Sequence, residues 1–297
     1  MTTPKLSMDS VFGRLYRQPD ININVGLNAE EMWKLVCDGT LAPSITNVLD
    51  VANKPFLKKW AAKLAAQAAV DVANKHPDDV RSRAQTAAKW AAMASDRAAD
   101  RAANLGDVVH NICEQRALGD TPNVPPDAVP YVESWERWVS DYQPEFLRVE
   151  TTTYGNVDIP ETNGYAGTGD VFVRVGGMVL AGDYKTGRNV YDSAAQQLAA
   201  LANATHIVSN TGDSLEPNFV VVGGIVIHLT PTGYNIRAVD TSMMAPAWKA
   251  FTAYRHAWTY HAKLLAARNP ILLSGSVKFA DLDTFFKYDR EENNNGL

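Results

Sequence analysis

Two aspartates and a lysine lie at the ends of two strands that the sequence predicts between residues 164 and 185. The segments VFVRV and MVLAGDY are rich in aliphatic residues, and the Gly-Gly pair at 176–177 suits a two-residue turn because glycine tolerates positive φ. Counting back from this turn places Asp170 opposite Asp183. Directly opposite side chains have Cβ atoms about 5 Å apart, so two carboxylates there need a cation or a shared proton.

A divalent metal with oxygen ligands is the cation that such a pair suits. Lys185 follows Asp183 by two residues, so strand alternation puts it on the same face, beside the metal. The same register sets Thr168 opposite Lys185. The alternative is a solvated strand face, which Asp-x-Lys alone would favour. Both strands are nearly continuous in apolar residues, as in strands covered on both faces, and charges there are costly unless paired or metal-bound. This burial favours a functional site.

Further strands and helices are predicted around the hairpin. Strands are expected near 146–154, 170–184 and 219–238, with helices between and after them, which indicates a mixed α/β fold. Glu150 lies in the first of these strands. It becomes a third carboxylate of the site if that strand neighbours the hairpin, and a solvent-facing acid if it does not.

Two alanine-rich helices, expected from Pro55 to about Lys75 and from about Val80 to Asn104, form the most basic region of the chain. Such a charge run is either a solvated helical face or a positive wall for a phosphate backbone. The basic residues here are Lys54, Lys58, Lys59, Lys63, Arg81, Arg83, Lys89, Arg97 and Arg101.

His110 follows among Val108, Val109 and Ile112, where a histidine is either a satisfied core residue or a neutral metal ligand. The proline-rich stretch TPNVPPDAVP cannot continue a helix and is the best candidate for an internal linker.

Composition bounds the class of protein. The 297 residues are 46% hydrophobic and 21% charged, as in an ordinary globular chain. A net charge of −5 argues against coating nucleic acid through overall charge, although a local basic groove is compatible with it. Two cysteines, Cys37 and Cys113, cannot build a disulfide framework or a four-cysteine site, so a cytoplasmic location is expected. Neither a signal peptide nor a membrane-spanning run is evident.

The order of these features resembles the PD-(D/E)XK nuclease superfamily, in particular the RecB-type and CRISPR-associated exonuclease branch with its stand-alone phage members. The motifs are, in order, Gly106-x-x-x-His110, Glu150, Gly167-Thr168-Gly169-Asp170, Asp183-Tyr184-Lys185 and Gln197. The resemblance covers about Ser44 to Asn203. It implies a restriction-endonuclease-like mixed central sheet flanked by helices, with a helical N-terminal region.

The resemblance also implies roles for these residues. Asp170, Asp183, the Tyr184 main-chain carbonyl, His110 and Glu150 would hold Mg²⁺ or Mn²⁺. Lys185 would position the attacking water, and Gln197 would contact the scissile region. Arg188, Lys58 and Lys59 would contact the DNA backbone.

The chain departs from the family pattern at two places. Leu201 stands where the QxxxY motif has tyrosine, and no iron–sulfur cluster is expected from two cysteines.

The resemblance predicts a metal-dependent DNA exonuclease of recombination, repair or phage DNA processing, with a recombination or helicase protein as a conceivable partner. The alternatives are a non-catalytic nucleic-acid-binding protein with the same fold and a site-specific endonuclease. The predicted organisation is a helical N-terminal region over 1–120 that contributes His110, a nuclease core over 121–290 and a disordered tail over 291–297.

Overall fold

A computed structural model describes residues 7–21, 27–52, 66, 70, 103–159, 162 and 164–266. The predicted Lys58 and Lys59 contacts, most of the two basic helices and the tail over 291–297 lie outside these residues. Within the described part, no helix is long and apolar enough to cross a membrane.

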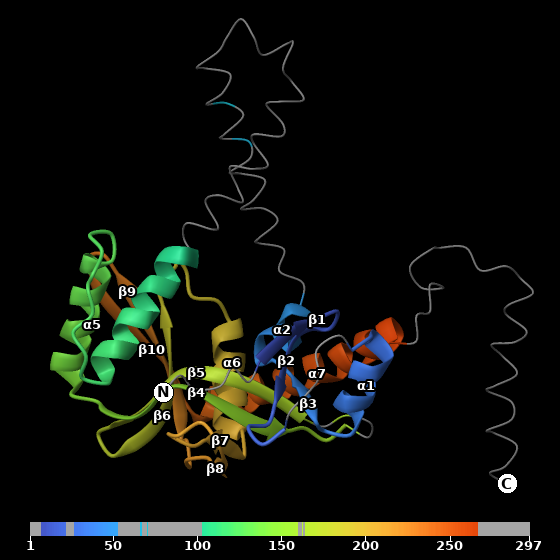
Figure 1. Cartoon of the computed structure of the whole chain (residues 1–297). Helices are drawn as coiled ribbons and strands as arrows, with labels where there is room; N and C mark the ends of the chain where they lie inside the picture. Colours follow the sequence, from blue (N-terminus) through green and yellow to red (C-terminus); the bar gives the residue numbers. More distant parts are fainter. Residues whose placement is uncertain are drawn as a thin grey trace, which may run out of the picture.

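A seven-stranded mixed sheet forms the centre of the molecule, in the order β10-β9-β6-β5-β4-β7-β8 (Figure 1). Its neighbours are antiparallel except β6 and β9, which pair in parallel. The mixed α/β sheet with flanking helices that the sequence predicts is therefore confirmed. The strands are β4 (Glu145–Asn156), β5 (Gly164–Val175), β6 (Met178–Lys185), β7 (His206–Val208), β8 (Leu215–Pro217), β9 (Gly223–Thr230) and β10 (Gly233–Val239).

Helices cover both faces of the sheet (Figure 1). On one face a helix over residues 103–117 and α5 (Val129–Tyr142) share a core cluster with the sheet. On the other face lie α6 (Ser193–Asn203) and α7 (Thr241–Ala266). Successive residues of β5 point into opposite clusters, Phe172 into one and Val171 and Val173 into the other. The apolar runs of the hairpin thus arise from burial on both faces, as predicted.

The N-terminal part adds a small three-stranded sheet that the sequence did not predict. It consists of β1 (Ser7–Ser10), β2 (Gly13–Arg17) and β3 (Leu41–Pro43), accompanied by α1 (Ala29–Cys37) and α2 (Ile45–Asp50). Asn28 caps α1 in a capping box with Glu31, and Ser44 caps α2. Side chains of this region share a cluster with α6 and α7, so it packs on the face opposite to α5.

Candidate functional site

The hairpin of β5 and β6 has the register that the Gly-Gly turn predicts. Backbone pairing runs from Val175–Met178 to Val171–Gly182 and then stops, so Asp170 and Asp183 are the next residues in register. The Asp170 carboxylate replaces the backbone there, because its Oδ2 accepts the Tyr184 N–H at 2.7 Å. The strands therefore separate at the point where the two acids lie.

Asp183 is buried, with 1% of its side chain exposed, and its partner is Lys185. The Lys185 Nζ lies 2.7 Å from Oδ1 and 2.6 Å from Oδ2. Only the Oδ1 contact has hydrogen-bond geometry, so Oδ2 is a buried acceptor without a hydrogen bond. Burial raises the pKa of Asp183, the charge of Asp170 raises it further, and Lys185 opposes both. A buried carboxylate beside a second acid attracts positive charge, and here the Lys185 ammonium supplies it to both oxygens.

His110 reaches this point from the helix over residues 103–117. Its Nδ1 lies 3.5 Å from Asp170 Oδ2, and its ring meets the Tyr184 ring edge-on. Burial lowers the pKa of His110 and the Lys185 ammonium lowers it further, so the imidazole is neutral at pH 7, which is the form that binds metals.

Gly106 brings this helix close to the end of β6. A Cβ at Gly106 would lie 3.1 Å from the Thr186 hydroxyl, which is tighter than ordinary contact. The glycine of the Gly-x-x-x-His pattern thus lets the helix approach, and His110 follows one turn later.

Glu150 lies on β4 opposite Asp170, because its neighbours pair as Val149–Val171 and Thr151–Gly169. Acids of three adjacent strands, β4, β5 and β6, therefore form one row. Glu150 has φ of 44°, a left-handed conformation that is unusual outside glycine. The Glu150 side chain is exposed to solvent in a cleft. The walls of the cleft nevertheless limit its hydration, which raises the pKa of Glu150 to about 7, and the charges of Asp170 and Glu114 raise it further.

Tyr184, Gln197 and Arg188 are the other predicted site residues within the described part of the chain. The Tyr184 side chain is buried against Trp138, and its backbone interacts with His110. Gln197 is half-buried on α6. Arg188 is exposed in the turn after β6.

The fit of this site to a divalent metal is partial. Among the described residues, no group of three His, Cys, Asp or Glu side chains could hold a metal ion as they stand. The Lys185 ammonium already donates to the Asp183 carboxylate, and the Tyr184 N–H already donates to the Asp170 carboxylate. The donor chemistry nevertheless fits Mg²⁺ or Mn²⁺: the buried carboxylate of Asp183, the partly buried carboxylate of Asp170 and a neutral imidazole. Binding would need the Lys185 ammonium to leave Asp183.

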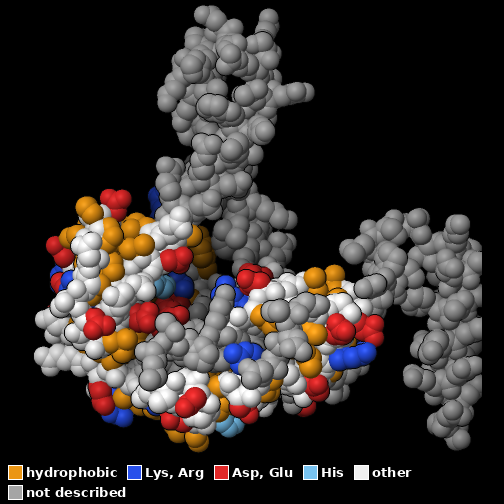
Figure 2. Space-filling model, viewed as in Figure 1, with side chains coloured by type: hydrophobic (Ala, Val, Ile, Leu, Met, Phe, Trp, Pro, Cys, Tyr) orange, Lys and Arg blue, Asp and Glu red, His pale blue; other side chains and the backbone are white. Residues whose placement is uncertain are grey.

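A cleft of about 570 Å³ lies beside the acid row, and Glu150 is in its wall. Sequence reasoning missed two charged residues that line it, Glu114 and Arg148. Spacing could have found both, since Glu114 follows His110 by one helical turn and Arg148 precedes Glu150 by two strand residues. In Figure 2, acidic, basic and histidine side chains gather on the face that carries this helix, next to a hollow.

Comparison with known proteins adds little to this description. No protein-family model matches the chain, and no curated protein matches it. The alignment with the crystal structure of SSO0001 covers 42% of this chain and 57% of the SSO0001 chain, at 12% sequence identity and a TM-score of 0.28. A similarity of this size identifies neither a family nor a function.

Proposed function

We propose that this protein is a divalent-metal-dependent DNA exonuclease of the PD-(D/E)XK type, acting in DNA recombination, repair or phage DNA processing. The observation that carries the proposal is the buried Asp183, paired with Lys185 and next to Asp170 and His110. A buried ion pair is a poor source of stability, so its presence here favours a functional role.

Bound Mg²⁺ or Mn²⁺ would polarise a phosphodiester and lower the pKa of a water molecule. Asp170 and Asp183 would bind the cation, with His110, the Tyr184 carbonyl and Glu150 as further ligands. Lys185 would then turn its ammonium from Asp183 to the attacking water and offset the charge that develops on the phosphoryl oxygens. Gln197 would contact the scissile region, and Arg188 would contact the DNA backbone.

Nuclease assays on labelled single- and double-stranded DNA with Mg²⁺ or Mn²⁺ test this assignment. We expect Asp183→Ala and Lys185→Ala each to lower the rate by about 10²-fold or more, since each removes a group that acts on the developing charge. Asp127→Ala and Lys249→Ala are matched controls at exposed positions and should cleave like the wild type. Equal rates for wild type and all four variants would end the proposal, and cleavage of circular DNA would indicate the endonuclease alternative.

A non-catalytic DNA-binding protein is the second candidate, and one observation favours it. No three-residue metal group is formed among the described side chains, and the Lys185 ammonium neutralises Asp183 without a metal ion. This alternative predicts DNA binding that needs no divalent metal and survives Asp183→Ala. Calorimetric titration with Mn²⁺ distinguishes the two candidate functions. Only a nuclease should bind Mn²⁺, and the Asp183→Ala variant should then no longer bind it.

A further inference from the structure

The cleft beside the acid row has a wall of hydroxyl groups. The Thr168 hydroxyl lies 3.2 Å from the Tyr16 hydroxyl on β2 and 3.1 Å from that of Thr152 on β4. These three residues and Ser209 line the cleft. Serine, threonine and tyrosine hydroxyls are common contacts for phosphate and sugar oxygens. The wall therefore presents neutral hydroxyls along a path that leads past Glu150, and the two mutual hydrogen bonds of Tyr16, Thr168 and Thr152 leave one hydroxyl proton for a ligand.

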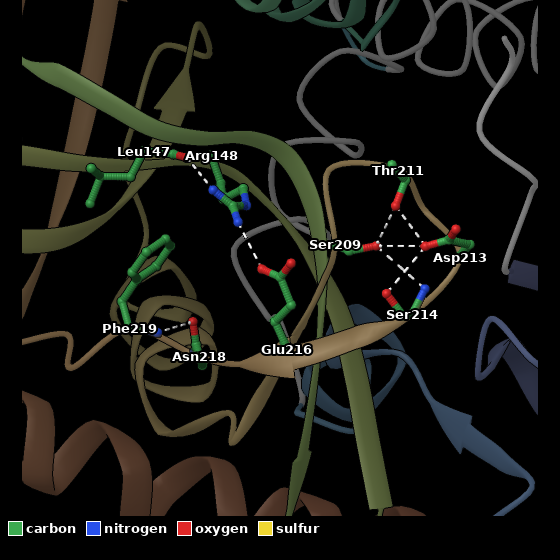
Figure 3. A network of polar contacts seen from close by, with 9 residues as sticks. All are labelled: Leu147, Arg148, Ser209, Thr211, Asp213, Ser214, Glu216, Asn218 and Phe219. Atoms are coloured by element: carbon green, nitrogen blue, oxygen red, sulfur yellow. Dashed lines mark hydrogen bonds and ion pairs between the residues drawn. The ribbon is translucent and has the colours of Figure 1, made fainter.

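Among the described residues that line the cleft, Arg148 is the one with a positively charged side chain. Its guanidinium donates to Glu216 Oε2 and to the Leu147 carbonyl, each at 2.9 Å, and lies 5.5 Å from the centre of the Phe219 ring (Figure 3). About 19% of the Arg148 side chain is exposed. Packing and pairing thus hold the guanidinium at the cleft, about 7 Å along β4 from Glu150.

A turn on the same side of the cleft is fixed by its own hydrogen bonds. The Asp213 carboxylate accepts from the hydroxyls of Ser209, Thr211 and Ser214, as Figure 3 shows. This network holds Ser209 and Asn210 at the cleft wall.

Resting on the proposed nuclease function, we propose that this cleft binds one strand of DNA beside the acid row and that Arg148 anchors a phosphate of that strand. A volume of about 570 Å³ is that of a small-molecule site, so it suits about one or two nucleotides of a single strand and not a duplex. Hydroxyl donors and one arginine contact the backbone without reading bases, which suits a strand of any sequence. The acids Glu114 and Glu150 repel phosphates, and the monovalent salt of the buffer screens that repulsion without a divalent metal.

Binding of a labelled mixed-sequence oligodeoxynucleotide to the full chain, measured by fluorescence anisotropy in EDTA over a series of salt concentrations, tests this. Arg148→Met keeps the apolar stem over Phe219 and removes the charge. We expect it to weaken binding about 5- to 10-fold at low salt and to lower the slope of log K against log salt by about 0.7, the value for one contact to a single strand. Arg174→Met is the matched control, since Arg174 is also ion-paired on the central sheet but does not line the cleft.

Glu216→Gln separates phosphate binding from a purely structural pairing. If Arg148 anchors a phosphate, removing its competing carboxylate should leave DNA binding equal or up to about twofold tighter. If Arg148 serves only its ion pair, Glu216→Gln should weaken binding as Arg148→Met does, which overturns the inference. If circular dichroism shows that Arg148→Met does not fold, Glu216→Gln and Arg148→Lys provide the test instead. Arg148→Lys should retain the wild-type slope of log K against log salt.

The remaining outcomes also decide. Equal affinity and slope for wild type and Arg148→Met, or equal losses for Arg148→Met and Arg174→Met, overturn the inference. An equal loss on a blunt duplex overturns the single-strand assignment. Failure of the wild type to bind any DNA overturns both this inference and the nuclease proposal. Metal-dependent cleavage by a wild type whose binding does not depend on Arg148 overturns this inference alone.

Discussion

Asp183 and Lys185 form an ion pair at the proposed site, and burying its charges costs free energy. The carboxylate is almost fully buried, whereas about a third of the Lys185 side chain is exposed. Loss of the carboxylate would therefore leave an ammonium that can reach water, and loss of the lysine would leave a buried charge. The two members of the pair are not equivalent for stability.

Asp183→Asn should consequently leave the metal-free protein as stable as the wild type or more stable, by up to about 2 kcal/mol at pH 7. Burial raises the pKa of Asp183, so its ionised form is disfavoured in the folded state, and removing the ionisable group relieves that cost. Urea unfolding in EDTA measures the change. A large loss of stability would show that the carboxylate is structural, in conflict with a functional task.

Glu150 gives a pH-dependent expectation at the same scale. Its pKa in the folded protein is about 7, above its ordinary value of 4.5, so between these values the folded state binds more protons than the unfolded state. The free energy of unfolding should then fall as pH rises through this window, and Glu150→Gln should make that dependence shallower. Urea unfolding of both proteins from about pH 4.5 to 7.5 in EDTA checks it. If wild type and Glu150→Gln show the same dependence of unfolding free energy on pH, the raised pKa of Glu150 is contradicted. Glu216→Gln, which removes another acid of the sheet, is the control.

At the scale of elements, the approach of the helix over residues 103–117 to β6 sets the position of His110. Gly106→Ala has two opposing effects: a better helix former gains about 1 kcal/mol, and a Cβ 3.1 Å from the Thr186 hydroxyl costs a comparable amount. We expect stability within about 1 kcal/mol of wild type and retained cleavage. Gly106→Leu cannot be accommodated without moving the helix, so it should lower Mn²⁺ affinity and cleavage together.

Thermal unfolding, Mn²⁺ titration and cleavage rate, measured on both Gly106 variants, test this expectation. Gly119→Leu serves as a comparison because a Cβ at Gly119 would meet no atom of the described residues within 4 Å, although its φ of 92° makes some loss of stability expected. Normal Mn²⁺ binding by Gly106→Leu would mean that His110 does not depend on this close approach.

At the scale of the whole molecule, Arg255 on α7 joins that helix to the segment that enters β5. The side chain is fully buried and has no carboxylate partner among its described contacts. It donates to the Gly164 carbonyl, to Thr162 and to Thr259, and lies over the Trp258 ring. Burial lowers its pKa to about 9, which leaves it charged at neutral pH.

Arg255→Ala should lower the free energy of unfolding by about 3 kcal/mol, because it opens a cavity and removes donors from buried carbonyl groups. Lys249→Ala, on an exposed position of the same helix, should change it by less than about 0.5 kcal/mol. Chemical denaturation of both variants provides the measurement. Similar small effects would show that α7 is held to the sheet by apolar contacts alone.

The sequence by itself determined what depends on near neighbours in the chain. The Gly-Gly turn fixed the register of β5 and β6 because a two-residue loop leaves one way to pair its strands, and this brought Asp170 and Asp183 together. The strands predicted near 146–154 and 219–238 likewise correspond to β4, β9 and β10, because strand-forming residues lie close together in the chain there.

Only the tertiary structure decided which distant elements meet. The choice of β4 as the neighbour of β5 put Glu150 opposite Asp170, and the parallel pairing of β6 with β9 ordered the rest of the sheet. The partner of Lys185, the cleft and the part of Arg148 in it also follow from contacts between residues far apart in sequence. Such contacts depend on how whole faces pack, and no local spacing specifies them.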